Sequence, residues 1–162
     1  MFWNKAKRFG VLLLTLSLIS ISARAQSEYT LETVAEGLNF PWSIAFLPGG
    51  DYLVAMRSGE VRNISADGSV SEPITGLPES YVMSQGGYFD ITVDPNFTSN
   101  QRIYLSFAYG TPEANGTRIV TGTLKGNTVT DVTPIFTVTP LKDTPVHYGG
   151  KILFQSDVKL MM

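Results

Sequence analysis

The sequence repeats one pattern three times. An apolar segment, a turn with proline or aspartate, and a second apolar segment follow one another from Ile44, from Ile91 and from Ile152. The starts lie 47 and 61 residues apart. Recurrence at about fifty residues predicts a β-propeller, in which each blade is a four-stranded sheet that packs against its neighbours. An ordinary β-sandwich whose strands resemble one another is the alternative that three loose copies leave open.

Short β-branched and aromatic segments between glycines and prolines predict an all-β fold. Residues 43–47 and 52–56 flank a Pro-Gly-Gly-Asp turn, and residues 117–124 and 128–132 flank Lys-Gly-Asn in a predicted hairpin. A propeller takes about four to eight blades to close. The chain holds about two blades and the start of a third, so we expect the N-terminal part of a larger domain. Four aromatic residues are expected in the blade cores: Trp42, Tyr52, Phe89 and Tyr104.

Residues 1–25 have the order of a secretory signal peptide. A basic region at positions 5–8 precedes an apolar run at 11–21 and then Ala-Arg-Ala at 23–25. The apolar run is too short to cross a bilayer comfortably, which argues against a membrane anchor. We therefore expect cleavage after Ala25, leaving a secreted or periplasmic protein with no membrane span in its mature domain, residues 26–162.

The charge of the mature chain excludes some partners. The sequence has 12 basic and 14 acidic residues, and four of the basic residues precede position 26, so the mature chain has a net charge of −6. Without a basic patch, nucleic acid and anionic membrane surfaces are poor partners. The absence of cysteine excludes thiolate chemistry and cysteine-based metal sites.

An ordered set of motifs resembles the soluble glucose/sorbosone dehydrogenase family, the quinoprotein aldose sugar dehydrogenases. The first motif, residues 37–48, begins with Gly-Leu-Asn-Phe-Pro-Trp. The hairpin that follows it in the family is similar to Arg-Ser-Gly-Glu-Val-Arg at 57–62. Gln-Gly-Gly-Tyr-Phe-Asp opens a glycine-rich motif at 85–97, and residues 117–136 resemble the next hairpin. His-Tyr-Gly-Gly-Lys-Ile at 147–152 resembles the family's His-aromatic-Gly-Gly-basic-apolar motif. The set covers nearly all of the mature chain.

The resemblance implies a six-bladed propeller that binds pyrroloquinoline quinone (PQQ) and calcium. Such enzymes oxidise the anomeric carbon of an aldose to a lactone and pass the electrons to an acceptor, which the sequence does not identify. Most of the cofactor-binding site would lie on blades beyond Met162, so we expect the chain alone to be inactive. A non-catalytic propeller module that binds a carbohydrate or a protein is the alternative function, and a truncated product without a stable fold is a third interpretation.

His147 is the candidate catalytic residue. It is the only histidine, and oxidation of an alcohol by hydride transfer needs a base for the hydroxyl proton, for which imidazole is suited. Gly149 and Gly150 would let the backbone approach a bound ring or adopt a dihedral closed to other residues. A solvated or structurally hydrogen-bonded histidine at a strand entrance is the alternative.

Gln85 is the candidate substrate-binding residue. Its amide can donate to and accept from a sugar hydroxyl at once, and the resemblance implies that the matching glutamine faces the active-site opening. A glutamine in a solvated turn is the alternative.

The sequence departs from the family pattern at four positions near these motifs. Ser84 replaces a usual glycine, Asp94 a frequent histidine and Lys151 a common arginine, while Val146 stands where some members carry aspartate. Four aspartates do not have the dense spacing of a calcium loop, so no metal ligand is assigned, and cofactor-binding residues stay unassigned too. These aspartates are Asp90, Asp94, Asp143 and Asp157.

Overall fold

The computed structural model describes residues 29–156 and 159–162. The chain divides into two units, residues 1–32 and 33–162, and the second contains all the strands described here. The predicted signal peptide and its cleavage site lie outside the described residues. Within the described ranges, no helix has the length and apolar character that crossing a bilayer requires.

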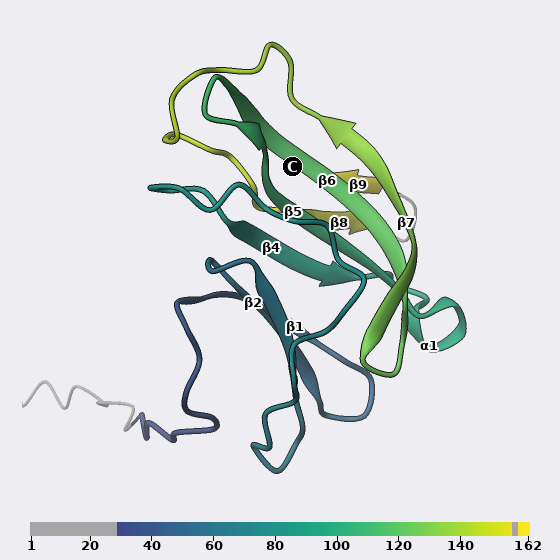
Figure 1. The fold of residues 1–162 in the computed structure, drawn as a ribbon. Coiled ribbons are helices and arrows are strands. Elements are labelled where there is room, and N and C mark those ends of the chain that lie inside the picture. The colour runs from purple at the N-terminus through teal and green to yellow at the C-terminus, as the bar shows by residue number, and fades with distance from the viewer. Residues whose placement is uncertain (1–28, 157–158) are drawn as a thin grey trace, which may run out of the picture. The chain divides into compact units, whose positions relative to one another are not determined.

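The first sheet is antiparallel and is built from consecutive strands. It contains β1 (Pro41–Phe46), β2 (Tyr52–Met56) and β3 (Glu60–Ile64), in that order. A bridge from Ile64 to Val70 adds the beginning of a fourth strand position. Consecutive antiparallel strands joined by tight turns are the topology of a propeller blade (Figure 1).

The second sheet has all four strands. Its order is β4 (Tyr88–Val93), β5 (Arg102–Thr111), β6 (Ala114–Lys125) and β7 (Thr128–Thr137). The short helix α1 (Phe97–Asn100) connects β4 to β5. All three pairings are antiparallel, so each strand returns alongside the one before it.

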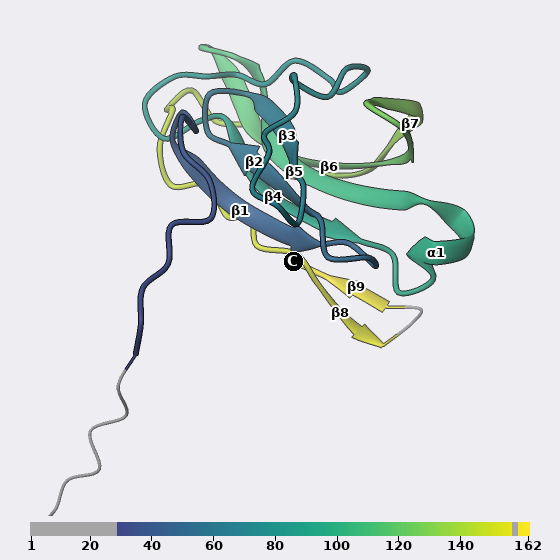
Figure 2. The same cartoon turned by 90° about the horizontal axis from the view of Figure 1, so that it is seen from below.

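A third sheet begins near the end of the chain. It pairs β8 (Leu153–Ser156) with β9 (Lys159–Met161). The ring of Phe154 on β8 lies edge-on to Tyr104 on β5, with centroids 5.3 Å apart. The second sheet contacts both of the others: β1 and β2 lie against β4, and β8 contacts β5 through Phe154. In Figure 1, β8 and β9 are drawn behind β5 and β6, and Figure 2 shows the same sheets from below.

The first two sheets share one hydrophobic core. Burial of apolar side chains between them supplies the main driving force for their packing. Strand β4 is buried along most of its length because the first sheet lies against it on one side and the segment leading to β8 on the other. The core includes Ala45, Leu53, Ala55 and Val61 of the first sheet and Ile91, Ile103, Leu105, Phe107, Val120 and Val129 of the second.

The predicted fold class is confirmed: the chain is all-β and contains about two propeller blades and the start of a third. The three repeat copies coincide with β1, β4 and β8, the first strand of each sheet. The hairpin predicted from residues 117–124 and 128–132 is formed by β6 and β7. That residues 26–162 form one domain stays a prediction.

Of the four aromatic residues expected in the blade cores, one is exposed and two are only partly buried. Trp42 on β1 is 63% exposed, and Tyr52 and Tyr104 are partly buried. Side chains alternate between the two faces of a strand, and Ala45 faces the shared core whereas Trp42, Ile44 and Phe46 face the opposite side. Within the described part of the chain that side of β1 has no covering sheet. Phe89 is buried, as expected.

Candidate active site

Two loops meet at the ends of the sheets where β4 and β8 begin. The backbone N–H of His147 donates to Oε1 of Gln85 at 2.8 Å, and the backbone N–H of Gln85 donates to the carbonyl of Pro145 at 3.1 Å. The structure therefore brings together the two site residues that the sequence singled out, although 62 positions separate them. Both side chains are exposed to solvent.

His147 has a left-handed backbone, with φ of +58°. Histidine enters this region more readily than most residues but still adopts it uncommonly. Among the described residues, no side chain or backbone group is hydrogen-bonded to its imidazole. The ring is therefore accessible to a ligand, and no aspartate among the described residues is hydrogen-bonded to it.

Tyr148 is held firmly beside His147. Its hydroxyl donates to Oδ1 of the fully buried Asn115. Its ring packs against Phe89, with centroids 5.2 Å apart, and Nζ of Lys142 lies 4.0 Å from the ring centroid. Burial raises the pKa of Tyr148 and lowers the pKa of Lys142. These contacts hold the backbone on the C-terminal side of His147 in one place.

Gly149 and Gly150 are fixed by hydrogen bonds from the second sheet. Oγ1 of Thr117 donates to the Gly149 carbonyl at 2.6 Å, and Oγ of Ser106 donates to the Gly150 carbonyl. Neither glycine has a positive φ. A Cβ on Gly150 would lie 2.6 Å from Cβ of Phe89, so this glycine is required by close packing and not by an unusual dihedral.

The loop that carries Gln85 is equally constrained. Ser84 has a φ of +53°, and its carbonyl accepts a hydrogen bond from Nη1 of Arg57. A Cβ on Gly87 would lie 2.0 Å from the Arg57 carbonyl, so only glycine allows this approach. Gly86 and Gly87 are both buried. Gln85 therefore projects from a rigid turn.

A hollow of about 320 Å³ lies next to this site. Nζ of Lys151 lies 3.0 Å from the buried carboxylate of Asp90, and its side chain is 76% exposed. The hollow thus combines aromatic walls with one neutralised cation. Within the described ranges, no three His, Asp or Glu side chains gather as a metal site. The lining residues are Trp42, Ser43, Ile44, Phe89, Asp90, Tyr148, Gly150 and Lys151.

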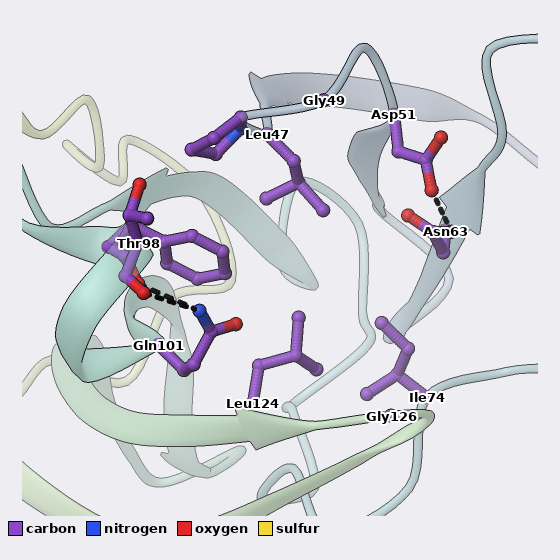
Figure 3. A pocket seen from close by; sticks show the side chains of 11 residues that line it. Leu47, Gly49, Asp51, Asn63, Ile74, Thr98, Gln101, Leu124 and Gly126 are labelled. Atoms are coloured by element: carbon purple, nitrogen blue, oxygen red, sulfur yellow. Dashed lines mark hydrogen bonds between the residues drawn. The ribbon is translucent and has the colours of Figure 1, made fainter.

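A second cavity, of about 400 Å³, lies at the opposite end of the sheets (Figure 3). The β1–β2 turn, α1 and the β6–β7 turn surround it. Its polar residues bond to nearby groups: Nδ2 of Asn63 donates to Asp51 at 3.2 Å, and Nε2 of Gln101 donates to the Phe97 carbonyl at 2.9 Å. Because β4 separates it from Gln85 and His147, we assign it no part in the candidate site.

Asp94 also lies at that opposite end of β4. Its carboxylate accepts hydrogen bonds from the Tyr104 hydroxyl at 3.0 Å and from the Asn96 backbone at 2.9 Å. Burial alone would raise the pKa of Asp94, but these bonds, a bond from Asn100 and the charge of Arg102 lower it overall. This departure from the family pattern is therefore structural and distant from His147.

Sequence reasoning missed the residues that support the site. Four of them bond the backbone of other residues, and Asn115 bonds the Tyr148 hydroxyl. Some lie within the family motifs, but the motif patterns do not indicate these contacts. The family-typical glycine pairs flanking Gln85 and His147 were the one available signal that two backbones pack closely there. The missed residues are Arg57, Asp90, Ser106, Asn115 and Thr117.

Known proteins resemble this chain over most of its length. The aldose sugar dehydrogenase YliI of Escherichia coli K12 is 33% identical over 134 residues, which are 80% of this chain and 36% of that protein. The crystal structure of the apo soluble aldose sugar dehydrogenase from Escherichia coli superposes with a TM-score of 0.72 at 34% identity, covering 76% of this chain and 37% of that one. The PQQ-bound aldose sugar dehydrogenase from Streptomyces coelicolor gives 0.67 at 28% identity, with the same coverage.

The chain thus spans little more than a third of the length of the relatives it matches. The family model described as Glucose / Sorbosone dehydrogenase matches residues 38–162, which include all three sheets and the loops of Gln85 and His147. The chain belongs to the glucose/sorbosone dehydrogenase family.

Proposed function

We propose that the chain is the N-terminal part of an exported quinoprotein that oxidises the anomeric carbon of an aldose to a lactone. His147 is the general base and Gln85 contacts the sugar. The observation that supports the proposal is the 2.8 Å contact between these two residues, which belong to separate family motifs. The names of the Escherichia coli and Streptomyces coelicolor relatives support the reaction class and PQQ, and the pattern of residues 1–25 supports export.

The proposed reaction removes two electrons and two protons from the sugar. The imidazole of His147 accepts the proton of the C1 hydroxyl while a hydride leaves C1. Bound PQQ would supply the two-electron acceptor, with calcium as its metal. Histidine is the side chain that most often serves as a general base in enzymes, which supports this role for His147.

The described residues meet part of what PQQ requires. The hollow beside Tyr148 offers aromatic walls that suit a planar ring system. PQQ is also a polycarboxylate, and the ammonium of Lys151 is already paired with Asp90. The cofactor's charge therefore needs cations from the other blades of a six-bladed ring. We expect the purified 162-residue chain to reduce no dye with glucose, PQQ and calcium, and dye reduction would contradict this.

His147→Asn in the complete polypeptide tests the base. Asparagine tolerates the left-handed backbone at position 147, whereas its amide cannot accept the proton. We expect turnover to fall about 10²- to 10⁴-fold with an unchanged unfolding midpoint. Asp131→Asn is the matched control, because Asp131 is an exposed left-handed residue on β7, away from the site.

Unchanged turnover in His147→Asn would remove His147 from the base role. If the unmodified complete polypeptide, loaded with PQQ and calcium, oxidises no aldose, the oxidoreductase proposal fails. Retention of that protein on immobilised sugar would then favour the binding module.

A further inference from the structure

We propose that Gln85 is a positioning residue for His147: its side-chain oxygen holds the His147 backbone in the left-handed conformation that presents the imidazole. This inference rests on the proposed function for its catalytic consequence. The structural part stands on the contacts of the two loops.

The two sides of His147 are anchored differently. On the C-terminal side, Tyr148, Gly149 and Gly150 each have a hydrogen bond to a residue of β5 or β6. On the N-terminal side, Gln85 provides the hydrogen bonds that the described part of the chain makes to residues 143–147. Its backbone N–H bonds the Pro145 carbonyl, and its Oε1 bonds the His147 N–H.

The conformation at His147 needs such an anchor. A left-handed backbone costs an L-residue about 1–2 kcal/mol. It persists where surrounding contacts determine it, and such residues often serve function. The bond to Oε1 satisfies the His147 N–H in this conformation, and rotation of the peptide would break it. Gln85 can serve as an anchor because Gly86, Gly87 and the Arg57–Ser84 contact fix its own loop.

The same bond restricts what Gln85 can offer to a sugar. Because Oε1 already accepts the His147 N–H, the Nε2 amino group is the part of the side chain available as a donor. Gln85 then approaches a sugar oxygen with a donor while its oxygen holds the base. One side chain would thus set the distance between substrate and imidazole.

Two substitutions separate the positioning role from a substrate contact. Gln85→Glu keeps an oxygen acceptor for the His147 N–H but removes the Nε2 donor. Gln85→Met keeps a similar length and volume but offers no strong acceptor. Gln101→Met is the control, since the Gln101 side chain bonds the backbone of α1 at the other end of β4.

The single histidine makes a direct readout possible. In the untagged 162-residue chain, selective ¹⁵N-histidine labelling gives one backbone amide signal, that of His147. We expect Gln85→Met to speed hydrogen exchange of this amide about tenfold, the loss of one net hydrogen bond, and to change its coupling to Hα. Gln85→Glu and Gln101→Met should leave both unchanged. Equal exchange in Gln85→Met and the unmodified chain would overturn the positioning role, as would equal acceleration in Gln85→Glu.

Kinetics of the complete, cofactor-loaded polypeptide provide the second readout. A positioning role predicts that Gln85→Met lowers kcat about tenfold in addition to raising KM, whereas Gln85→Glu, which loses only the donor to the sugar, raises KM with a smaller loss of kcat. If Gln85 acts only as a donor to the sugar, both variants raise KM alike and the His147 amide does not respond, which would overturn the inference. If the unmodified protein has no turnover, the proposed function fails and the amide measurement still decides the structural part.

Discussion

The buried carboxylate of Asp90 on β4 accepts a 2.8 Å hydrogen bond from the backbone N–H of Ile152, just before β8. The same carboxylate accepts bonds from Oγ of Ser43 on β1 and from Nζ of Lys151. Asp90 on β4 therefore connects β1 with the two residues that directly precede β8. Because the loops of Gln85 and His147 immediately precede β4 and β8, this carboxylate also sets the distance between those loops.

We expect Asp90→Ala to destabilise the chain by about 3 kcal/mol, because it leaves the buried Ile152 N–H without its charged acceptor. Lys151→Gln should cost less than about 1 kcal/mol, since the ammonium end of the pair is mostly solvated. Urea unfolding of both variants measures the difference. Similar losses for the two would mean that the ion pair, and not the buried backbone bond, stabilises the junction.

Ser84→Gly should stabilise the chain by about 0.5–1 kcal/mol. It relieves a left-handed serine, and the greater flexibility of glycine in the unfolded state offsets part of the gain. Ser69→Gly is the control, because Ser69 is exposed and does not have a positive φ; it should be slightly destabilised. Thermal unfolding of the two variants should give midpoints that shift in opposite directions, and a lower midpoint for Ser84→Gly would contradict the strain assigned to position 84.

Gly87→Ala should destabilise the chain by more than about 2 kcal/mol, because the new Cβ would meet the Arg57 carbonyl at 2.0 Å. Gly49→Ala provides a control for the dihedral alone: Gly49 also has a positive φ, +111°, but its Cβ position is open. Equilibrium unfolding of both variants separates the free-energy cost of the dihedral from that of the contact with the Arg57 carbonyl. Equal losses would show that the dihedral, and not the contact with Arg57, requires glycine at position 87.

The raised pKa of Tyr88 predicts that the chain loses stability in alkali. Burial raises its pKa to about 12 from the ordinary 10.0, and its hydroxyl donates to the Pro78 carbonyl at 2.6 Å. Between pH 10 and 12 the unfolded state therefore loses a proton that the folded state retains. The free energy of unfolding should fall there by up to about 1.4 kcal/mol per pH unit from this group.

Tyr88→Phe isolates this contribution from those of the other tyrosines and lysines. It should cost about 1 kcal/mol at pH 7, where the hydrogen bond is lost, and flatten the decline above pH 10. Urea unfolding at pH 7, 10 and 11 measures both effects. A decline as steep as that of the unmodified chain would show that Tyr88 does not titrate differently on folding.

Much of the fold follows from local patterns. The strand–turn–strand repeat predicted β1, β4 and β8 because each copy has a short apolar segment followed by a connection with proline or aspartate. Boundaries were less predictable: residues 114–116 belong to β6, although Asn-Gly has the composition of a turn. The reason is tertiary, since the buried side chain of Asn115 bonds the Thr111 carbonyl and the Tyr148 hydroxyl.

The sequence indicated Gln85 and His147 as candidate site residues but did not predict the contact between them. The family motifs indicated Gln85 and His147, yet the bond between them uses a backbone N–H, which every non-proline residue has. No sequence pattern marks such a donor. Trp42 shows the converse limit: its aromatic character suggested the core, whereas exposure depends on whether another sheet covers that face of β1.

The separation of the two ends of the sheets has a consequence for how this scaffold tolerates change. The β1–β2 turn, α1 and the β6–β7 turn lie at the end remote from His147, so residues inserted there can loop into solvent without moving a site residue. The loop leading to His147 cannot accommodate an inserted residue in this way. One residue added between Lys142 and Pro145, whose backbones are both hydrogen-bonded to other segments, would shift the imidazole relative to Gln85. The turns remote from His147 can therefore take up insertions, whereas the loop that precedes His147 keeps a fixed length.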